Sequence, residues 1–424
     1  MKKHVITRLD AREILDCRGE PTVQVALEVD HSIEVVADVP AGRSTGVHEV
    51  SELRDGETRY AGRGVSKAVN NVIREIAPLL VGMDVTCQRE IDARMIECDG
   101  TEDKSRLGAN AIVGASLAAA RGAAAALGIP LYRYIDPNAQ VLPVPLVNLI
   151  NGGKHASNDL DFQEFCIFPV GAQTFNEAME ISFAVNTRLR DLIVAKYGKI
   201  AANVGDEGGF APPIVKVREA MDCLVSAVEG SGCASKIVYG LDCAATHLYD
   251  QRSGTYSVEG RSMSAEALLE FYQGLLRSYP IASIEDPFSE DDIDGFVAAT
   301  AQLGIQIVGD DFFCTNPKRI RERAARSAGN ALLWKVNQIG TLSEALDAAA
   351  VAYRNGYAVM VSERSGETED SIIADLAVGL NAGQIKTGAP VRGERTSKYN
   401  RLLAIERELG PLARYAGQNY RICF

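Results

Sequence analysis

Apolar and polar residues alternate along the first 40 residues of the chain. The segments PTVQVALEVD (21–30) and HSIEVVADVP (31–40) place apolar side chains at about every second position. This is the period of a β-strand that is buried on one face only. The preceding segment HVITRLDAREILD (4–16) shows a similar pattern, so we expect the three segments to pair as a meander.

Helical patterns follow the predicted meander, at about 65–80, 86–97 and 109–127. The segment IDPNAQ then contains the turn-forming residues that are common where two domains join. We therefore interpret residues 1–137 as an N-terminal α+β domain with three strands and several helices.

The remaining chain, residues 138–424, contains short apolar runs that end in polar side chains. These runs are EFCIF, KIVYGLDCA, PIASIEDPF, GIQIVGDDF, ALLWKVNQIG, YAVMVSERSG and AGQIKTGAP. Six polar residues at the run ends are separated by 43, 25, 25, 28 and 23 residues: Asp242, Glu285, Asp310, Lys335, Glu363 and Lys386. Strands that alternate with helices at this spacing are typical of a parallel β/α barrel.

An open, doubly wound sheet is the alternative to a barrel. Such a sheet commonly carries a glycine-rich phosphate-binding sequence after an early strand, and none is present here. We therefore predict an α/β protein with a β/α barrel over residues 138–424. In a barrel the carboxyl ends of parallel strands open on one rim, so the six polar residues should meet there.

Composition limits the possible partners. Among 424 residues, 44 are Lys or Arg and 56 are Asp or Glu, which gives a formal net charge of −12 without any basic run. This balance argues against nucleic acid or an anionic membrane surface as the main partner. The Ala/Gly-rich segment 109–129 carries Arg121, so we expect a buried helix there and no membrane span.

The amino terminus and the cysteines predict a cytoplasmic protein. Asp10 appears before any apolar segment of signal-peptide length. The nine cysteines include no C-x-x-C pair, and their number is odd. Reduced thiols are the simplest interpretation.

Three of the predicted strand ends are acidic: Asp242, Glu285 and Asp310. Three carboxylates at close range repel one another and raise one another's pKa values unless a cation lies between them. Any one of them could be a solvated loop residue, but three at neighbouring strand ends favour a metal site. Oxygen ligands of this kind suit Mg²⁺, with Mn²⁺ as the alternative.

Lys335 and Lys386 end the strands that follow. A lysine beside a metal ion has its ammonium pKa lowered by the like charge, which suits a general base. A base next to a metal predicts removal of a proton α to a carboxylate, with the metal stabilising the added charge. Arg364 and Lys386 are expected to clamp a phosphate or carboxylate, although Arg364 alone could be a surface ion pair.

Two glycine-rich loops carry further polar residues. NVGDEGGFAPP places Glu207 between glycines, and NGGKHASNDLDFQEF contains His155, Gln163 and Glu164. A single His or Glu in such a loop is commonly structural, but two loops of this kind are expected to close over a substrate.

Together these segments resemble the enolase family along the whole chain. The motifs that carry the resemblance are STGVHE, KSRLGANAIVGASLAAAR, NGGKHA with QEF, NVGDEGGFAP, GLDCA, SIEDPF, DDFFCTNPKRI, KVNQIGTLSEA, RSGETED and GQIKTGAP. The resemblance implies a barrel with an antiparallel second strand, and a homodimer or larger assembly.

The resemblance also implies a role for each site residue. Asp242, Glu285 and Asp310 would bind the tighter Mg²⁺, and Ser44 would help bind a second Mg²⁺. Lys335 would be the base, and Glu207, assisted by Glu164, would be the acid that removes a hydroxyl group. The remaining members of the catalytic and substrate-binding group would be His155, Gln163, Arg364, Ser365 and Lys386.

The chain departs from the family pattern beside these residues. Enolases have His where this chain has Glu363, and a small residue where it has Arg43. Lys154 also replaces a small residue, and Trp334 replaces a small aliphatic residue before the base, which is expected to add bulk near the rim. A carboxylate beside Arg364 would repel an anionic substrate, so Glu363 should either pair with Arg43 or face the pocket.

These departures lead to three functional hypotheses. The preferred one is a pocket adapted to another anionic substrate, bound by Arg43, Lys154 and Glu363. It resembles carboxyphosphonoenolpyruvate synthase of phosphinothricin-type pathways, which joins the phosphonoformyl group of a CMP anhydride to a three-carbon acid. The alternative is an ordinary enolase, which interconverts 2-phosphoglycerate and phosphoenolpyruvate. A third is a non-catalytic binding or structural protein on the same scaffold.

Overall fold

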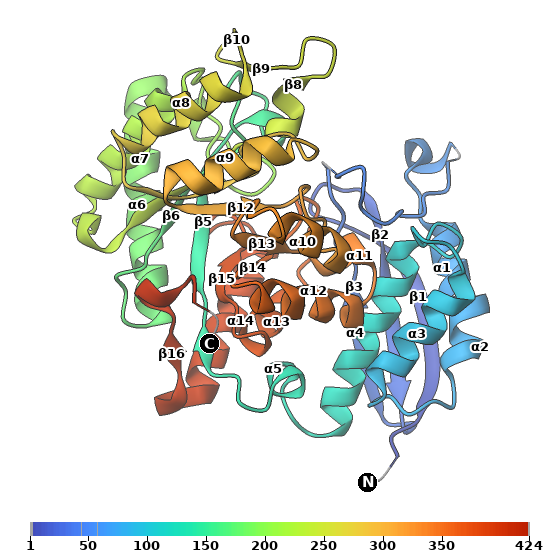
Figure 1. The fold of residues 1–424 in the computed structure, drawn as a ribbon. Coiled ribbons are helices and arrows are strands. Elements are labelled where there is room, and N and C mark those ends of the chain that lie inside the picture. The colour runs from blue at the N-terminus through green and yellow to red at the C-terminus, as the bar shows by residue number, and fades with distance from the viewer. Residues whose placement is uncertain (1–2, 44, 57, 423–424) are drawn as a thin grey trace.

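The computed structural model describes residues 3–43, 45–56 and 58–422. The predicted metal ligand Ser44 lies outside the described residues. Two assemblies of strands and helices stand side by side, with the amino-terminal one in blue and cyan in Figure 1. Among the described ranges, no helix is long and apolar enough to cross a membrane.

The amino-terminal region contains the predicted three-stranded antiparallel meander. It consists of β1 (Ile6–Leu15), β2 (Pro21–Val29) and β3 (Ile33–Asp38). The helices that follow are α1 (Ser66–Asn71), a π turn (Val72–Ile76), α2 (Ala77–Leu80), α3 (Gln88–Asp99), α4 (Ala109–Ala126) and α5 (Leu131–Ile135). Helix α4 is the predicted buried Ala/Gly-rich helix, and it covers the sheet (Figure 1).

Small residues let α4 approach the sheet closely. A Cβ atom on Gly114 would lie 2.7 Å from Val25, and one on Gly122 would lie 2.7 Å from Leu27. Both distances are too short for non-bonded carbon atoms, so any larger side chain would separate the helix from the sheet.

The carboxy-terminal region forms a closed barrel of eight strands. In spatial order they are β11 (Ile281–Glu285), β12 (Gln306–Gly309), β13 (Ala331–Trp334), β14 (Ala358–Ser362), β15 (Gly383–Lys386), β5 (Val144–Asn151), β6 (Glu164–Phe168) and β7 (Val238–Asp242). The predicted α/β fold class with a barrel is confirmed. Strand β5 was missed, because Pro143 and Pro145 argue against a strand in the sequence.

Strand β6 runs antiparallel to both of its neighbours, as the resemblance implies. The argument from parallel strands therefore does not apply to β6, whose carboxyl end points away from this rim. Its first residue, Glu164, pairs with Asn151 at the end of β5 and with Asp242 at the end of β7. The reversed direction thus brings Glu164 to the same rim as the other strand ends.

Helices surround the barrel (Figure 1). They are α6 (Phe175–Tyr197), α7 (Val217–Gly230), α8 (Ala265–Leu276), α9 (Ile293–Leu303), α10 (Pro317–Ala324), α11 (Val336–Ile339), α12 (Leu342–Arg354), α13 (Ile372–Gly379) and α14 (Gly393–Leu409). Short strands complete the fold: β4 (Val141–Leu142), β8 (Tyr249–Asp250), β9 (Thr255–Val258), β10 (Arg261–Met263) and β16 (Arg414–Tyr415).

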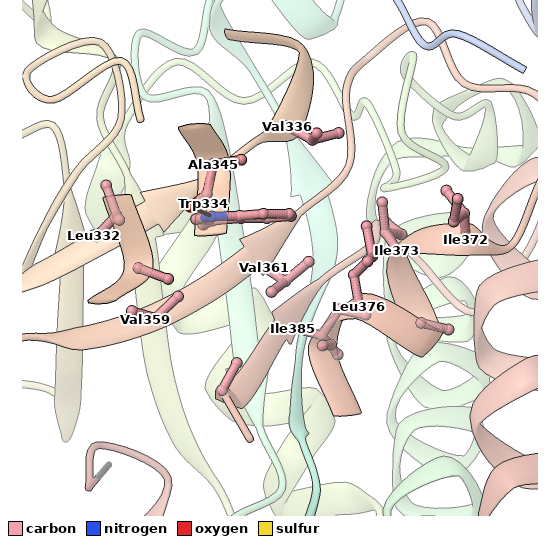
Figure 2. Packing of buried hydrophobic residues seen from close by; sticks show 14 of the residues in the cluster. Leu332, Trp334, Val336, Ala345, Val359, Val361, Ile372, Ile373, Leu376 and Ile385 are labelled. Carbon is pink, nitrogen blue, oxygen red and sulfur yellow. Dashed lines mark hydrogen bonds between the residues drawn. The ribbon is translucent and has the colours of Figure 1, made fainter. Parts of the chain in front are cut away.

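Trp334 belongs to the layer between the barrel and its helices. Leu333 packs in the barrel interior, so the next residue along the strand points outward. Figure 2 shows Trp334 among Val336, Ala345 and Val361, and its indole N–H donates to the carbonyl oxygen of Ala345 at 2.6 Å. The expectation that Trp334 adds bulk near the rim is therefore wrong.

Candidate active site

Most of the predicted site residues line one polar cavity at the barrel rim. Those that line it are His155, Gln163, Glu164, Glu207, Asp242, Asp310, Lys335, Glu363, Arg364, Ser365 and Lys386. The predicted ligand Glu285 is buried beside them and contacts Lys386. The loop after β3 closes one side of the cavity through Gly42.

Lys386 lies at the centre of three carboxylates. Its Nζ atom is 3.0 Å from Asp242 Oδ2, 2.9 Å from both oxygens of Glu285 and 3.1 Å from Glu164 Oε1. Burial alone would lower the pKa of Lys386, but these carboxylates raise it well above its ordinary value. Burial and the Asp242 charge likewise raise the pKa of Glu285.

Lys335 follows β13 and contacts the third predicted metal ligand. Its Nζ atom lies 2.6 Å from Asp310 Oδ2, while Gln338 donates to Asp310 Oδ1 at 2.8 Å. Burial favours a lower pKa for Lys335, but Asp310 raises it above its ordinary value. The sequence argument expected a lowered pKa for Lys335 because it placed a metal ion beside the ammonium group. In the structure the neighbour is the Asp310 carboxylate, which raises the pKa instead.

His155, Glu164 and Glu207 form a second buried group on the opposite wall. His155 Nδ1 is 3.4 Å from Glu207 Oε1 and 3.7 Å from Glu164 Oε1. Burial and the charge of Glu207 raise the pKa of Glu164 well above its ordinary value. Burial also favours a higher pKa for Glu207, but His155 and Lys386 hold it well below the usual range. The two carboxyl groups can therefore share one proton, held mainly by Glu164.

Glu363 forms a buried ion pair with Arg395 of α14. Its Oε2 atom accepts from Arg395 Nη1 at 2.6 Å, and neither side chain is more than 1% exposed. Burial raises the pKa of Glu363, while the Arg395 guanidinium, whose own pKa is raised by Glu363, opposes this effect and favours the ionised carboxylate. Its Oε1 atom has no hydrogen-bond partner among the described residues. The predicted Glu363–Arg43 pair is therefore wrong, because Arg395 takes that place.

Arg43 forms its ion pair with Asp206, in the loop that carries Glu207. Its backbone N–H donates to Ser365 Oγ at 2.9 Å. Lys154 is exposed and borders a separate pocket beside the rim, together with His247. Burial, followed by the charge of Lys154, lowers the pKa of His247 to about 4.

Arg364 is oriented by the amino-terminal region. Glu49 accepts from Arg364 Nη1 at 2.9 Å and from Nη2 at 3.1 Å, and Asn337 Oδ1 accepts from Nη1 at 3.0 Å. This two-oxygen contact fixes the plane of the guanidinium group at the cavity wall.

Sequence reasoning missed Arg395, Glu49 and Asp286. Asp286 accepts the backbone N–H groups of Asp310 and Asp311 at 2.8 and 3.0 Å, and so fixes the end of β12. Arg395 lies in GERTSKYNRLL, a largely polar segment without a clear apolar stripe. Only its position in space, and no sequence pattern, identifies it as the partner of Glu363.

Among the described residues, two groups of side chains have ligand atoms close enough together to share one cation. One consists of His155, Glu164 and Glu207, and the other of Asp286, Asp310 and Asp311. The three predicted ligands also fit a cation, because the ammonium groups of Lys386 and Lys335 lie against them at 2.6–3.0 Å. Hard carboxylate oxygens gathered around positive charge are the donor set that divalent cations prefer.

A barrel with these acids and lysines at its rim is characteristic of enolase-type enzymes. Residues 6–135 match the family model "Enolase, N-terminal domain", and residues 139–423 match "Enolase, C-terminal TIM barrel domain". The chain therefore belongs to the enolase family and is an enzyme.

Several similar proteins carry the name enolase. That of Thermococcus gammatolerans is 57% identical over 421 residues, which is 98% of each chain. That of Methanocaldococcus jannaschii is 56% identical over 415 residues, and that of Pyrococcus furiosus is 57% identical over 419 residues. Both matches cover 98% of this chain and 97% of the relative.

Proposed function

We propose that this protein is an ordinary enolase, which reversibly dehydrates 2-phosphoglycerate to phosphoenolpyruvate. The observation that carries the proposal is the cavity with a lysine on one wall and a pair of carboxyl groups on the other. Lys335 can take a proton from one carbon, while Glu164 and Glu207 can protonate a hydroxyl group on the next. Relatives of almost the same length that are named enolase support the same reaction.

The residues at the rim supply the charges that such a substrate needs. Asp242, Glu285 and Asp310 would hold Mg²⁺, which supplies positive charge to stabilise the doubly negative carboxylate formed when the α-proton leaves. Arg364 and Lys386 present cations to the anionic groups of the substrate. Two metal ions, with Ser44 at the second, remain part of this proposal.

The proton steps follow from the positions of the side chains. Lys335 Nζ accepts the α-proton, so it must be neutral before the reaction, and Mg²⁺ held by Asp310 would favour this neutral form by offsetting the carboxylate charge. The proton shared by Glu164 and Glu207 passes to the departing hydroxyl group, which leaves as water. Burial of both carboxyl groups and of His155 keeps bulk water away from this proton.

Three of the four departures that favoured a different substrate have partners within the protein, and the fourth, Lys154, is exposed beside a separate pocket. Glu363 is paired with Arg395, Arg43 with Asp206, and Trp334 is packed against α12. The pocket therefore needs no second substrate to balance the charges of Glu363 and Arg43. For this reason we prefer ordinary enolase over the synthase-like hypothesis, and the intact set of acids and lysines disfavours a non-catalytic role.

Turnover of 2-phosphoglycerate with Mg²⁺, followed by the ultraviolet absorbance of the enol product, tests the proposal. We expect kcat in the common range of about 1–10³ s⁻¹. A parallel reaction with CMP-phosphonoformate and phosphoenolpyruvate tests the synthase-like activity. Conversion of this pair, without turnover of 2-phosphoglycerate, would reverse our preference. Cytoplasmic location, the homo-oligomer and the domain boundary at residue 137 remain predictions.

A further inference from the structure

Two arginines hold the segment that carries Glu207. Asp206, the preceding residue, forms an ion pair with Arg43 through its carboxylate. Its carbonyl oxygen accepts from Arg395 Nη2 at 3.0 Å, and its N–H donates to the His155 carbonyl oxygen at 2.9 Å. The residue before Glu207 is therefore fixed at its side chain and at both of its peptide groups.

The same two arginines also meet at Ser365. The backbone N–H of Arg43 donates to Ser365 Oγ at 2.9 Å, and Arg395 Nη2 donates to the Ser365 carbonyl oxygen at 2.7 Å. Arg43, Asp206, Arg395 and Ser365 thus form a closed ring of contacts. We call these four residues the Asp206 ring.

Two of the three charged departures from the enolase pattern act on this ring. Arg43 is a member of it, and Glu363 holds Arg395 through the 2.6 Å bond between Oε2 and Nη1. Arg395 uses that same nitrogen to reach the Arg364 carbonyl oxygen at 2.8 Å, which leaves Nη2 directed at Asp206 and Ser365. Glu363 therefore fixes the orientation in which Arg395 contacts Asp206.

We propose that Arg43 and Glu363 are positioning residues for Glu207, which they hold in place through Asp206. This inference rests on the proposed function, because it assigns the two residues to the dehydration half of that reaction. Glu207 is also held from the other side, where its carbonyl oxygen accepts from the Ala389 N–H at 2.9 Å. A displacement of about 1 Å at a reacting group can lower a rate by about 100-fold.

The test separates protonation of the departing hydroxyl group, which Glu207 serves, from removal of the α-proton, which Lys335 serves. With Mg²⁺ in deuterated water, loss of the α-proton of 2-phosphoglycerate is measured by NMR beside its dehydration. For Glu363→Gln we expect the dehydration rate to fall more than about tenfold. The rate at which the α-proton exchanges with deuterium should change less than about twofold. For Arg43→Ala we expect the dehydration rate to fall about three- to fivefold, because a half-exposed ion pair contributes little free energy. Arg43→Lys should restore most of the dehydration rate.

Two further measurements make the test specific. In the double variant Arg43→Ala/Glu363→Gln, the dehydration rate should fall by less than the product of the two single-variant factors, because both residues act on Asp206. Arg43→Ala should also speed deuterium uptake by residues 203–211, measured by mass spectrometry. Arg89→Ala is the matched control: Arg89 is exposed and pairs with Asp347 across the same two regions, away from the cavity.

The outcomes distinguish this inference from the proposed function. If the unaltered protein neither exchanges nor dehydrates 2-phosphoglycerate, the proposed function fails, and deuterium uptake still decides whether Arg43 holds the segment. If it does both, and the ratio of exchange to dehydration is unchanged in Arg43→Ala and Glu363→Gln, the positioning role is wrong. Should Glu363→Gln fail to fold, Arg43→Ala still decides, since the Arg43 side chain is 52% exposed.

Discussion

Glu363 and Arg395 form an ion pair inside the protein, 32 residues apart in sequence and 2.6 Å apart in space. The pair accounts for a carboxylate beside Arg364 at the cavity wall, since the negative charge is balanced from α14. A charge that looks misplaced in the sequence is therefore part of the packing between α14 and the barrel rim.

The first prediction concerns the stability provided by this pair. Glu363→Leu leaves the Arg395 guanidinium buried without its carboxylate, so we expect the free energy of unfolding to fall by about 3–5 kcal/mol. Urea denaturation measures this change. Glu363→Leu combined with Arg395→Met should recover part of the loss, because it removes both buried charges. A loss below about 1 kcal/mol in the single variant would mean that the pair contributes no more than a surface pair.

Trp334 provides the second prediction. Its side chain is fully buried between β13 and α12, so Trp334→Ala should lower the free energy of unfolding by about 3–5 kcal/mol. The KM for 2-phosphoglycerate should remain unchanged below the melting temperature, because the indole points away from the cavity. A large rise in KM, with little loss of stability, would place Trp334 at the substrate instead.

The third prediction concerns metal binding. Chelation of divalent cations should abolish turnover, and Mg²⁺ should restore it. In the unaltered protein Mg²⁺ should raise the melting temperature, since a ligand that binds only the folded state stabilises it. Glu285→Gln should weaken this shift, whereas Asp375→Asn, which alters a distant ion pair with Arg401, should preserve it. An equal shift in Glu285→Gln would exclude Glu285 as a ligand.

The fourth prediction concerns the base. Lys335→Ala should abolish both dehydration and exchange of the α-proton, each by at least about 10²–10⁴-fold, because one side chain serves both. The Mg²⁺-dependent rise in melting temperature should persist, which separates loss of the base from loss of the metal site. Exchange that survives in Lys335→Ala would assign proton removal to another residue.

Much of the rim could be predicted from the sequence, because parallel strands place their carboxyl ends together. This reasoning located Asp242, Glu285, Asp310, Lys335 and Lys386. It could not place Glu164, whose position depends on the reversed direction of β6. That direction followed only from the resemblance to enolases.

The partners of the unusual charges could not be predicted. Arg43 and Asp206 come from loops that are 163 residues apart, and Arg395 lies on a helix with little apolar periodicity. Long-range ion pairs leave no periodic signal in a sequence. The proposed Glu363–Arg43 contact was wrong for this reason: opposite charges in the sequence do not reveal which of several partners lies nearest.

The central claim, reversible dehydration of 2-phosphoglycerate, is tested most directly by approaching equilibrium from both sides. Phosphorus NMR would follow the purified protein with Mg²⁺, starting in one sample from 2-phosphoglycerate and in the other from phosphoenolpyruvate. The account predicts that both samples reach the same ratio of the two compounds, without any added cosubstrate. No conversion in either direction by the folded, Mg²⁺-binding protein would contradict it.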